Sequence, residues 1–249
     1  MPSVLRPAHR PLPPRPVVRL AAAVLLLGAA ALAPAPALAA RTATVQEILD
    51  GRELYIDRAL ARVRQKAQAP QQVSTGNARG QLSFDNGAVG RLNRHSLLKL
   101  GSRCFLIESG QILVSGPQSG CTRSARMSVR GTNYVLEVQE NGESDLAVLE
   151  GSVQVEPLRE GEPSGDPPTT VEAGQRLRLS PEGVVLSILA LSAGDYTLIL
   201  NGPLFEGFRS PLPGFAALES HIRSRVPGVR MPAAPARAPS LPFGVPRLF

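Results

Sequence analysis

The feature that most constrains the fold is a pattern that recurs from about residue 44 to residue 187: a short run of residues with β propensity, followed by residues that favour a turn. The runs are residues 81–84, 104–107, 111–114, 134–138, 146–149, 153–155 and 175–179. The turn signals are Asp85-Asn86-Gly87, Ser109-Gly110, Asn141-Gly142, Glu150-Gly151, Ala173-Gly174 and Glu182-Gly183. Gly and Asn adopt positive φ at low cost, so these signals let the chain reverse. The pattern predicts an all-β domain, either a sandwich or a solenoid-like stack of short antiparallel strands.

Alternation gives several runs one buried face. Tyr134, Leu136 and Val138 point to one side of an extended chain and Glu137 to the other, as in a strand that is half exposed to water. Residues 44–58 are predicted to form a hairpin, residues 59–67 a strand or a short helix, and residues 156–170 an exposed loop. Residues 214–226 have apolar side chains at helical spacing, which predicts a short helix. From Pro227, proline and alanine dominate and predict an extended, disordered tail.

The N-terminal forty residues have the order of an export signal. Four arginines and no acid precede the apolar run 20–32, and the small-residue tripeptide Ala37-Leu38-Ala39 follows it. A membrane span usually needs roughly 20 apolar residues, so a cleaved signal peptide is favoured over an uncleaved anchor. The expected location is therefore the periplasm or the exterior, with membrane attachment only through an uncleaved signal.

Charge argues against nucleic acid as a partner. The formal net charge is +7, and removal of the four leader arginines leaves +3. Residues 41–206 hold 17 Lys/Arg and 19 Asp/Glu, whereas residues 207–249 hold six Arg and one Glu. A nucleic-acid-binding domain needs a basic face on its folded part, and this predicted domain is close to neutral.

The two cysteines, Cys104 and Cys121, are seventeen positions apart. In an exported chain such a pair predicts one structural disulfide. Redox or metal chemistry would favour closely spaced thiols or further ligands, so we expect neither a metal site nor a cofactor.

The turn motifs carry a family resemblance. Residues 128–138 contain Arg130-Gly131-Thr132 ahead of an alternating run, residues 148–155 contain Glu150-Gly151, and residues 171–175 contain Gly174. In this order they resemble the FecR domain, whose pattern is a VRGT-type turn, an EGxVxV hairpin and a closing AGQ turn. The resemblance covers roughly residues 44–186. We interpret Arg130, Gly131, Thr132, Glu150, Gly151 and Gly174 as structural turn residues.

The resemblance implies an all-β periplasmic module. In full-length FecR regulators this domain receives a signal from an outer-membrane transporter and passes it through a membrane helix to a cytoplasmic sigma factor. Only about nineteen residues precede the apolar run here. We therefore expect a stand-alone exported FecR-like protein rather than one that contacts a sigma factor.

Two candidate sites remain. A cationic series, if strands bring it together, would hold an anion such as a polysaccharide or a lipid headgroup; the alternative is a scattered, solvated face. It comprises Arg91, Arg94, Lys99, Arg103, Arg123 and Arg126. His95, Ser96 and Asp85 could be assembled into a hydrolase triad, but no GxSxG elbow is present, and we predict no catalytic residues.

The expected organisation is a signal peptide (1–40), a FecR-like all-β domain (41–190), an extension with a short helix (191–230) and a disordered Pro/Ala-rich tail (231–249). The favoured function is non-catalytic binding of another envelope protein or a glycan, with a signalling or scaffolding output. The alternative is a structural or adhesive surface protein that binds glycans.

Overall fold

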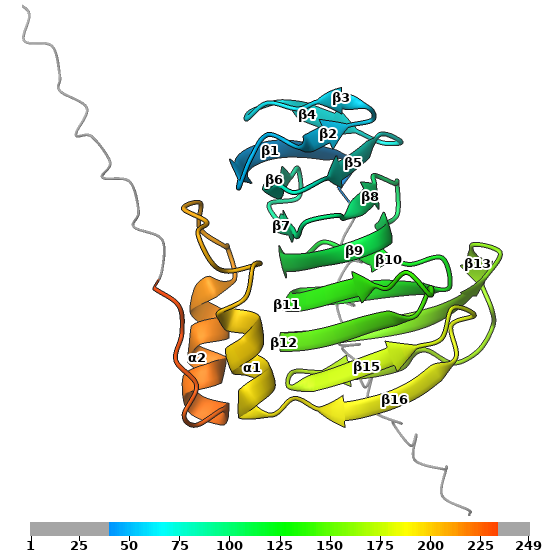
Figure 1. Ribbon diagram of the computed structural model, residues 1–249. Coiled ribbons are helices and arrows are strands. Elements are labelled where there is room, and N and C mark those ends of the chain that lie inside the picture. Colours follow the sequence, from blue (N-terminus) through cyan, green and yellow to red (C-terminus); the bar gives the residue numbers. More distant parts are fainter. Residues whose placement is uncertain (1–39, 234–249) are drawn as a thin grey trace, which may run out of the picture. The chain divides into compact units, whose positions relative to one another are not determined.

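Sixteen strands of one hydrogen-bonded sheet make up most of the computed structural model, which describes residues 40–233 (Figure 1). The strands are β1 (Thr42–Leu49), β2 (Leu54–Ile56), β3 (Ala59–Leu60), β4 (Lys66–Gln68), β5 (Gln72–Thr75), β6 (Arg79–Phe84), β7 (Val89–Leu92), β8 (Leu97–Lys99), β9 (Phe105–Gly116), β10 (Gly120–Cys121), β11 (Ala125–Val138), β12 (Ser144–Arg159), β13 (Glu162–Pro163), β14 (Thr169–Glu172), β15 (Gln175–Leu179) and β16 (Val185–Ala190). Two helices follow, α1 (Ala193–Leu200) and α2 (Phe215–Arg225). The all-β prediction is confirmed. The predicted signal peptide and most of the predicted tail lie outside the described residues.

Strand pairing divides this sheet into two layers. The central layer has the order β16-β15-β12-β11-β9-β7-β6-β1-β4, and the outer layer has the order β14-β12-β11-β10-β9-β8-β5-β2-β3. Strands β9, β11 and β12 belong to both, because one half of each pairs in each layer. The result is a sandwich in which strands are stacked along the chain from β1 to β16 (Figure 1).

Glycines allow the long strands to cross from one layer to the other. Gly110, Gly131 and Gly151 lie inside β9, β11 and β12 with φ of 82°, 56° and 81°. A bulge with a positive-φ glycine bends a strand without ending it. The predicted reversals at Ser109-Gly110 and Glu150-Gly151 are therefore wrong, since the chain bends there and continues as the same strand.

At Ala173-Gly174 the chain also steps between layers rather than reversing, since β14 and β15 pair with successive parts of β12. The predicted hairpin over residues 44–58 is wrong as well. Strand β1 pairs with β4 and β6, whereas β2 pairs with β3 and β5. Asp50, with φ of 64°, turns the chain between the layers.

The remaining turn signals behave as predicted. Asp85-Asn86-Gly87 joins β6 to β7, Asn141-Gly142 joins β11 to β12, and Glu182-Gly183 joins β15 to β16. Residues 59–67 form β3 and the start of β4, and no helix. The predicted loop 156–170 is shorter than expected, because β12 continues to Arg159 and pairs with β13.

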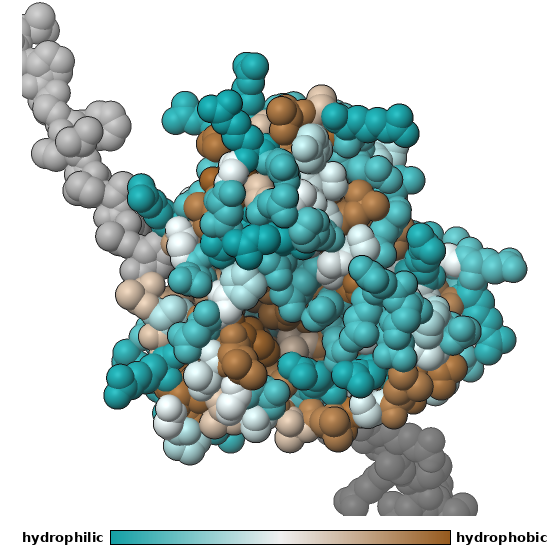
Figure 2. All heavy atoms as spheres, in the orientation of Figure 1, coloured by the Kyte–Doolittle hydropathy of each residue, from teal (hydrophilic) through white to brown (hydrophobic). Residues whose placement is uncertain are grey.

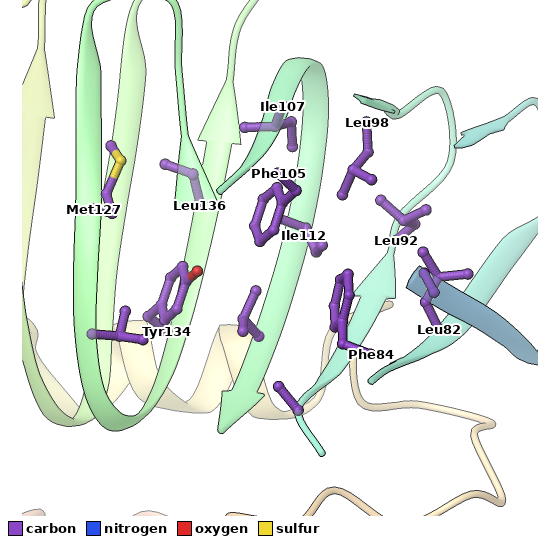
Figure 3. Packing of buried hydrophobic residues seen from close by; sticks show 14 of the residues in the cluster. Leu82, Phe84, Leu92, Leu98, Phe105, Ile107, Ile112, Met127, Tyr134 and Leu136 are labelled. Carbon is purple, nitrogen blue, oxygen red and sulfur yellow. The ribbon is translucent and has the colours of Figure 1, made fainter. Parts of the chain in front are cut away.

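The main core lies between the two layers. Phe84 from the central layer stacks on Phe105 from the outer layer, with ring centroids 6.0 Å apart (Figure 3). Tyr134 is fully buried and its hydroxyl donates to the carbonyl of Gln118 at 2.8 Å. Burial raises the pKa of Tyr134, so this phenol stays neutral and keeps its hydrogen bond.

The two helices cover the other face of the central layer (Figure 1). Leu113, Val135 and Leu149 of the sheet pack there against Tyr196 of α1 and Leu218 of α2. The prediction of a helix near residues 214–226 is confirmed by α2, whereas α1 was not predicted. Its signal is Ser192-x-x-Asp195, in which both halves of a capping box are formed.

Candidate functional site

The exposed edge strand β16 is the most unusual surface of the described residues. Strand β16 ends the central layer, and among the described strands it pairs only with β15. Eight large hydrophobic side chains of residues 40–233 are exposed, and five of them lie in one short stretch: Val184, Val185, Leu186, Ile188 and Leu189. Hydrophobic atoms gather along this edge in Figure 2. A long, uncharged edge strand is a template for pairing with another chain.

The register explains why apolar side chains on the inner face of β16 are exposed. Ile188 and Val185 lie opposite Leu177 and Leu179, which are both buried in the core between the layers. Cross-strand partners share one face, so Ile188 and Val185 extend the core side of the central layer. The outer layer ends one strand earlier, because β14 pairs with β12 as β15 does and no described strand follows β14 in that layer. No described strand therefore covers the inner face of β16.

The opposite edge of the central layer is built differently. Strand β4 has only three residues, begins with the exposed Lys66 and is followed by Pro70. Short length, lysine and proline are features that prevent edge-to-edge pairing. The stretch Val184–Leu189 contains no charged residue and no proline. The two edges therefore differ in whether they resist the addition of a strand.

The two arginines of β15, the strand beside β16, have acidic partners within the molecule. Arg178 of β15 pairs with Asp145 at 3.3 Å, and Arg176 approaches Asp195 of α1 at 3.9 Å. Hydrogen bonds from Ser192 lower the pKa of Asp195, which keeps that carboxylate ionised at the start of α1. The two arginines next to the apolar edge are thus paired, so neither leaves an uncompensated positive charge beside β16.

The predicted turn residues lie together at the bends between the layers. Asn133 and Glu150 are cross-strand partners, and Arg130 lies opposite Ser152, with register shifts on this side of the pairing. Thr132 is buried, and a Cβ on Gly151 would lie 2.6 Å from its Cγ2. Gly174 lies at the step from β14 to β15 with φ of 82°. These residues therefore pack and shape the bends where the strands cross between the two layers.

The cationic series does not form one exposed patch. Arg91 is buried, Arg94 pairs with Asp50 at 2.6 Å, Arg103 pairs with Glu162 at 3.4 Å, and Arg126 pairs with Glu156 at 2.9 Å. Arg123 is exposed beside the disulfide, and Lys99 is exposed at the end of β8. Four of the six therefore have internal partners or no access to solvent, and Lys99 is the member that lines a groove.

Arg91 acts instead as an anchor for the segment between the helices, residues 203–212, which we call the strap. Its guanidinium donates to Gln81 Oε1 at 2.8 Å, to the carbonyl of Leu204 at 3.1 Å and to that of Ser210 at 2.9 Å. It also lies 4.4 Å from the ring centroid of Phe208. Burial lowers the pKa of Arg91 to about 10, so the group remains charged at neutral pH.

Two further residues secure the strap. Arg79 donates to the carbonyls of Pro203 and Glu206, and its guanidinium pairs with Asp50. The Glu47 carboxylate accepts the N–H groups of Arg209 and Ser210. The sequence carries no signal for these contacts, because the acceptors are mainly backbone carbonyls more than a hundred positions away.

The disulfide between Cys104 and Cys121 is confirmed, with Cα atoms 5.8 Å apart. It joins the start of β9 to β10 and is typical of proteins that fold in an oxidising compartment. Within residues 40–233, no three His, Cys, Asp or Glu side chains are grouped so that they could hold a metal ion. None of the described helices is long and apolar enough to span a membrane.

The Ser96 hydroxyl belongs to the structure of a bend. Ser96 is buried, and its Oγ accepts the N–H of Gln111 at 3.0 Å and lies 3.1 Å from the carbonyl of Gln111. Asp85 accepts the N–H of Thr42. These contacts place Ser96 and Asp85 in separate hydrogen-bond networks.

Sequence comparison identifies no relative, since no family model matches the chain and no curated protein matches it. Among solved structures, the fold resembles two crystal structures of a candidate anti-sigma factor from Parabacteroides distasonis. They are 17% and 16% identical to the chain, and each has a TM-score of 0.43. Each similarity covers 61% of this chain, and 73% and 71% of the other chains. This is a partial likeness in chain path and says nothing of what the present chain binds.

Proposed function

We propose that this chain is an exported, non-catalytic, FecR-like module that binds another envelope protein by accepting an extended segment of it beside β16. The observation that carries the proposal is the apolar edge strand that no described strand covers. Strand addition supplies main-chain hydrogen bonds to the free edge and places alternate side chains of the partner on the two faces. The output of this binding is signalling or scaffolding.

The partner segment is apolar and adds to the sheet in the next strand position. Its inward-facing side chains would cover Val185 and Ile188, and its outward-facing ones would contact Leu189. Burying apolar area contributes about 25 cal/mol for each Å² removed from water, whereas the edge N–H and C=O groups supply direction and register. Two features support the proposal of export: the order of basic, apolar and small residues in the leader, and the disulfide.

Photo-crosslinking in the envelope tests the proposal. A photoreactive benzophenone side chain replaces Ser187 on β16, and mass spectrometry identifies the peptide to which it crosslinks. The variant Leu189→Lys places a charge on the edge, and we expect loss of the crosslinked product. The matched control is Leu198→Lys, which changes an exposed leucine of α1 and should leave the product unchanged.

The same samples are analysed for size by light scattering. A heterologous crosslinked segment that disappears with Leu189→Lys and persists with Leu198→Lys supports the proposal. Equal yields in both variants contradict it. A crosslink from β16 to a second copy of this chain also contradicts it and would assign the edge to self-association.

A further inference from the structure

We infer that a second surface, the groove on the side of the sandwich opposite the glycine bends, binds a small anionic amphiphile: a molecule with one carboxylate or phosphate group on an apolar body. The groove lies where β1 begins and β8 ends, so both layers contribute to it. Its volume is about 840 Å³, within the range of small-molecule sites, which is roughly 300 to 1,000 Å³. This inference does not depend on the proposed role of β16.

The rim of the groove carries positive charge that no ion pair among the described residues compensates. Arg41 and Lys99 both line it and are both exposed. Among the ion pairs of residues 40–233, none involves either of them, in contrast to Arg79, Arg94 and Arg126. No lining residue is acidic. The Asp85 carboxylate accepts the N–H of Thr42 and forms no ion pair with either cation among the described residues. A ligand acid would therefore find two cations free to pair with it.

The floor of the groove is apolar and supplies the other half of the recognition. Ala69, Pro70, Leu100 and Leu106 line it, whereas Gln68, Thr42 and Ser102 supply neutral hydrogen-bonding groups. A purely ionic ligand would leave this floor in contact with water, and a neutral apolar ligand would leave the two cations unpaired. An amphiphile with one acidic end uses both features.

The groove has a fixed wall. Residues 100–104 form the segment between β8 and β9, and the Cys104–Cys121 disulfide ties its end to β10. On the opposite side, the N–H of Ala69 donates to the carbonyl of Arg41 at 2.9 Å and holds β4 against β1. Both walls are therefore ordered without a ligand, so binding loses less conformational entropy.

Calorimetric titration tests the inference with three probes: octyl phosphate below its micellar concentration, methyl phosphate and octyl glucoside. Octyl phosphate should bind at least about tenfold more tightly than either of the other two, because only it uses the cations and the floor together. The double variant Arg41→Ala/Lys99→Ala should weaken octyl phosphate binding by about tenfold or more.

The matched control is Arg52→Ala/Arg225→Ala, which removes two exposed arginines outside the groove and keeps the same net charge as the test variant. We expect wild-type affinity from it, and urea unfolding confirms that both double variants are folded. Equal weakening in the two double variants overturns the inference, as does octyl glucoside binding as tightly as octyl phosphate.

Vesicles of phosphatidylcholine and phosphatidylglycerol form the last arm and distinguish a free amphiphile from a membrane surface. We expect that vesicles do not sediment the protein while the octyl phosphate monomer binds. Sedimentation that requires Arg41 and Lys99, without monomer binding, would overturn the inference and assign the two cations to a membrane surface.

Discussion

The variant Arg91→Ala should destabilise the protein through its effect on the strap, although sequence alone places Arg91 on the surface. The substitution leaves two buried acceptors, Gln81 Oε1 and the carbonyl of Leu204, without their donor, together with the partly buried carbonyl of Ser210. A buried polar group left unpaired costs about 1–3 kcal/mol, so two cost about 2–6 kcal/mol. The strap can partly relax toward water, so we expect a loss of about 3 kcal/mol in the free energy of unfolding.

Urea denaturation measures the loss. At a slope of about 2 kcal/mol/M, the midpoint should fall by about 1–2 M. Hydrogen exchange should also accelerate in residues 203–212 before the strands respond, because the strap loses its anchor while the main core keeps its packing.

The matched control is Arg94→Ala, three positions along the chain. Arg94 pairs with Asp50 at the surface, and its side chain is 46% exposed. Exposed ion pairs contribute about 0–1 kcal/mol, so this variant should remain close to the wild type. If Arg91→Ala and Arg94→Ala cost the same, or if exchange in the strap is unchanged, the anchoring account is refuted.

Three further predictions concern the disulfide, one bend and acid stability. Replacing both Cys104 and Cys121 by serine should cost about 3 kcal/mol by urea unfolding, as for a loop of similar length, and reduced wild type should match the variant. Gly151→Ala should cost more by the same assay than Gly161→Ala, because both have positive φ but only Gly151 has a neighbouring side chain within 3 Å of the added Cβ. The hydrogen bond from Arg79 lowers the pKa of Asp50 below 3.8. The stability that ionised Asp50 contributes is therefore fully present above pH 3.8 and is lost as the pH falls through the lower pKa of the folded state. Asp50→Asn should therefore flatten the acid limb of a plot of stability against pH, and an unchanged slope would contradict this.

The sequence predicted the fold class well because turn chemistry and alternation are local. The hairpins at Asn141-Gly142 and Glu182-Gly183 follow from positive φ at glycine, which depends on no distant contact. The same local rule misread Ser109-Gly110 and Glu150-Gly151. A glycine with positive φ serves equally in a reversal and in a bulge, and only pairing with distant strands decides between them.

The candidate surfaces were harder to predict. Strand β16 has a sequence signal, an apolar run directly after Glu182-Gly183, but its exposure depends on the outer layer ending at β14. Arg91 is indistinguishable in the sequence from an exposed arginine, since two of its three acceptors are the distant backbone carbonyls of Leu204 and Ser210. Arg41 and Lys99 meet in one groove only because β1 and β8 lie in facing layers.

Hydrogen exchange of β16 tests the central claim most directly, with the purified protein compared before and after addition of the partner segment found by crosslinking. In an antiparallel edge strand alternate N–H groups point away from the sheet. We predict that exchange of the outward-pointing amides of Val185–Ala190 slows at least tenfold on binding, and that Leu189→Lys prevents this. Unchanged exchange along β16, or protection confined to α1 and α2, would contradict the claim that a partner strand adds to this edge.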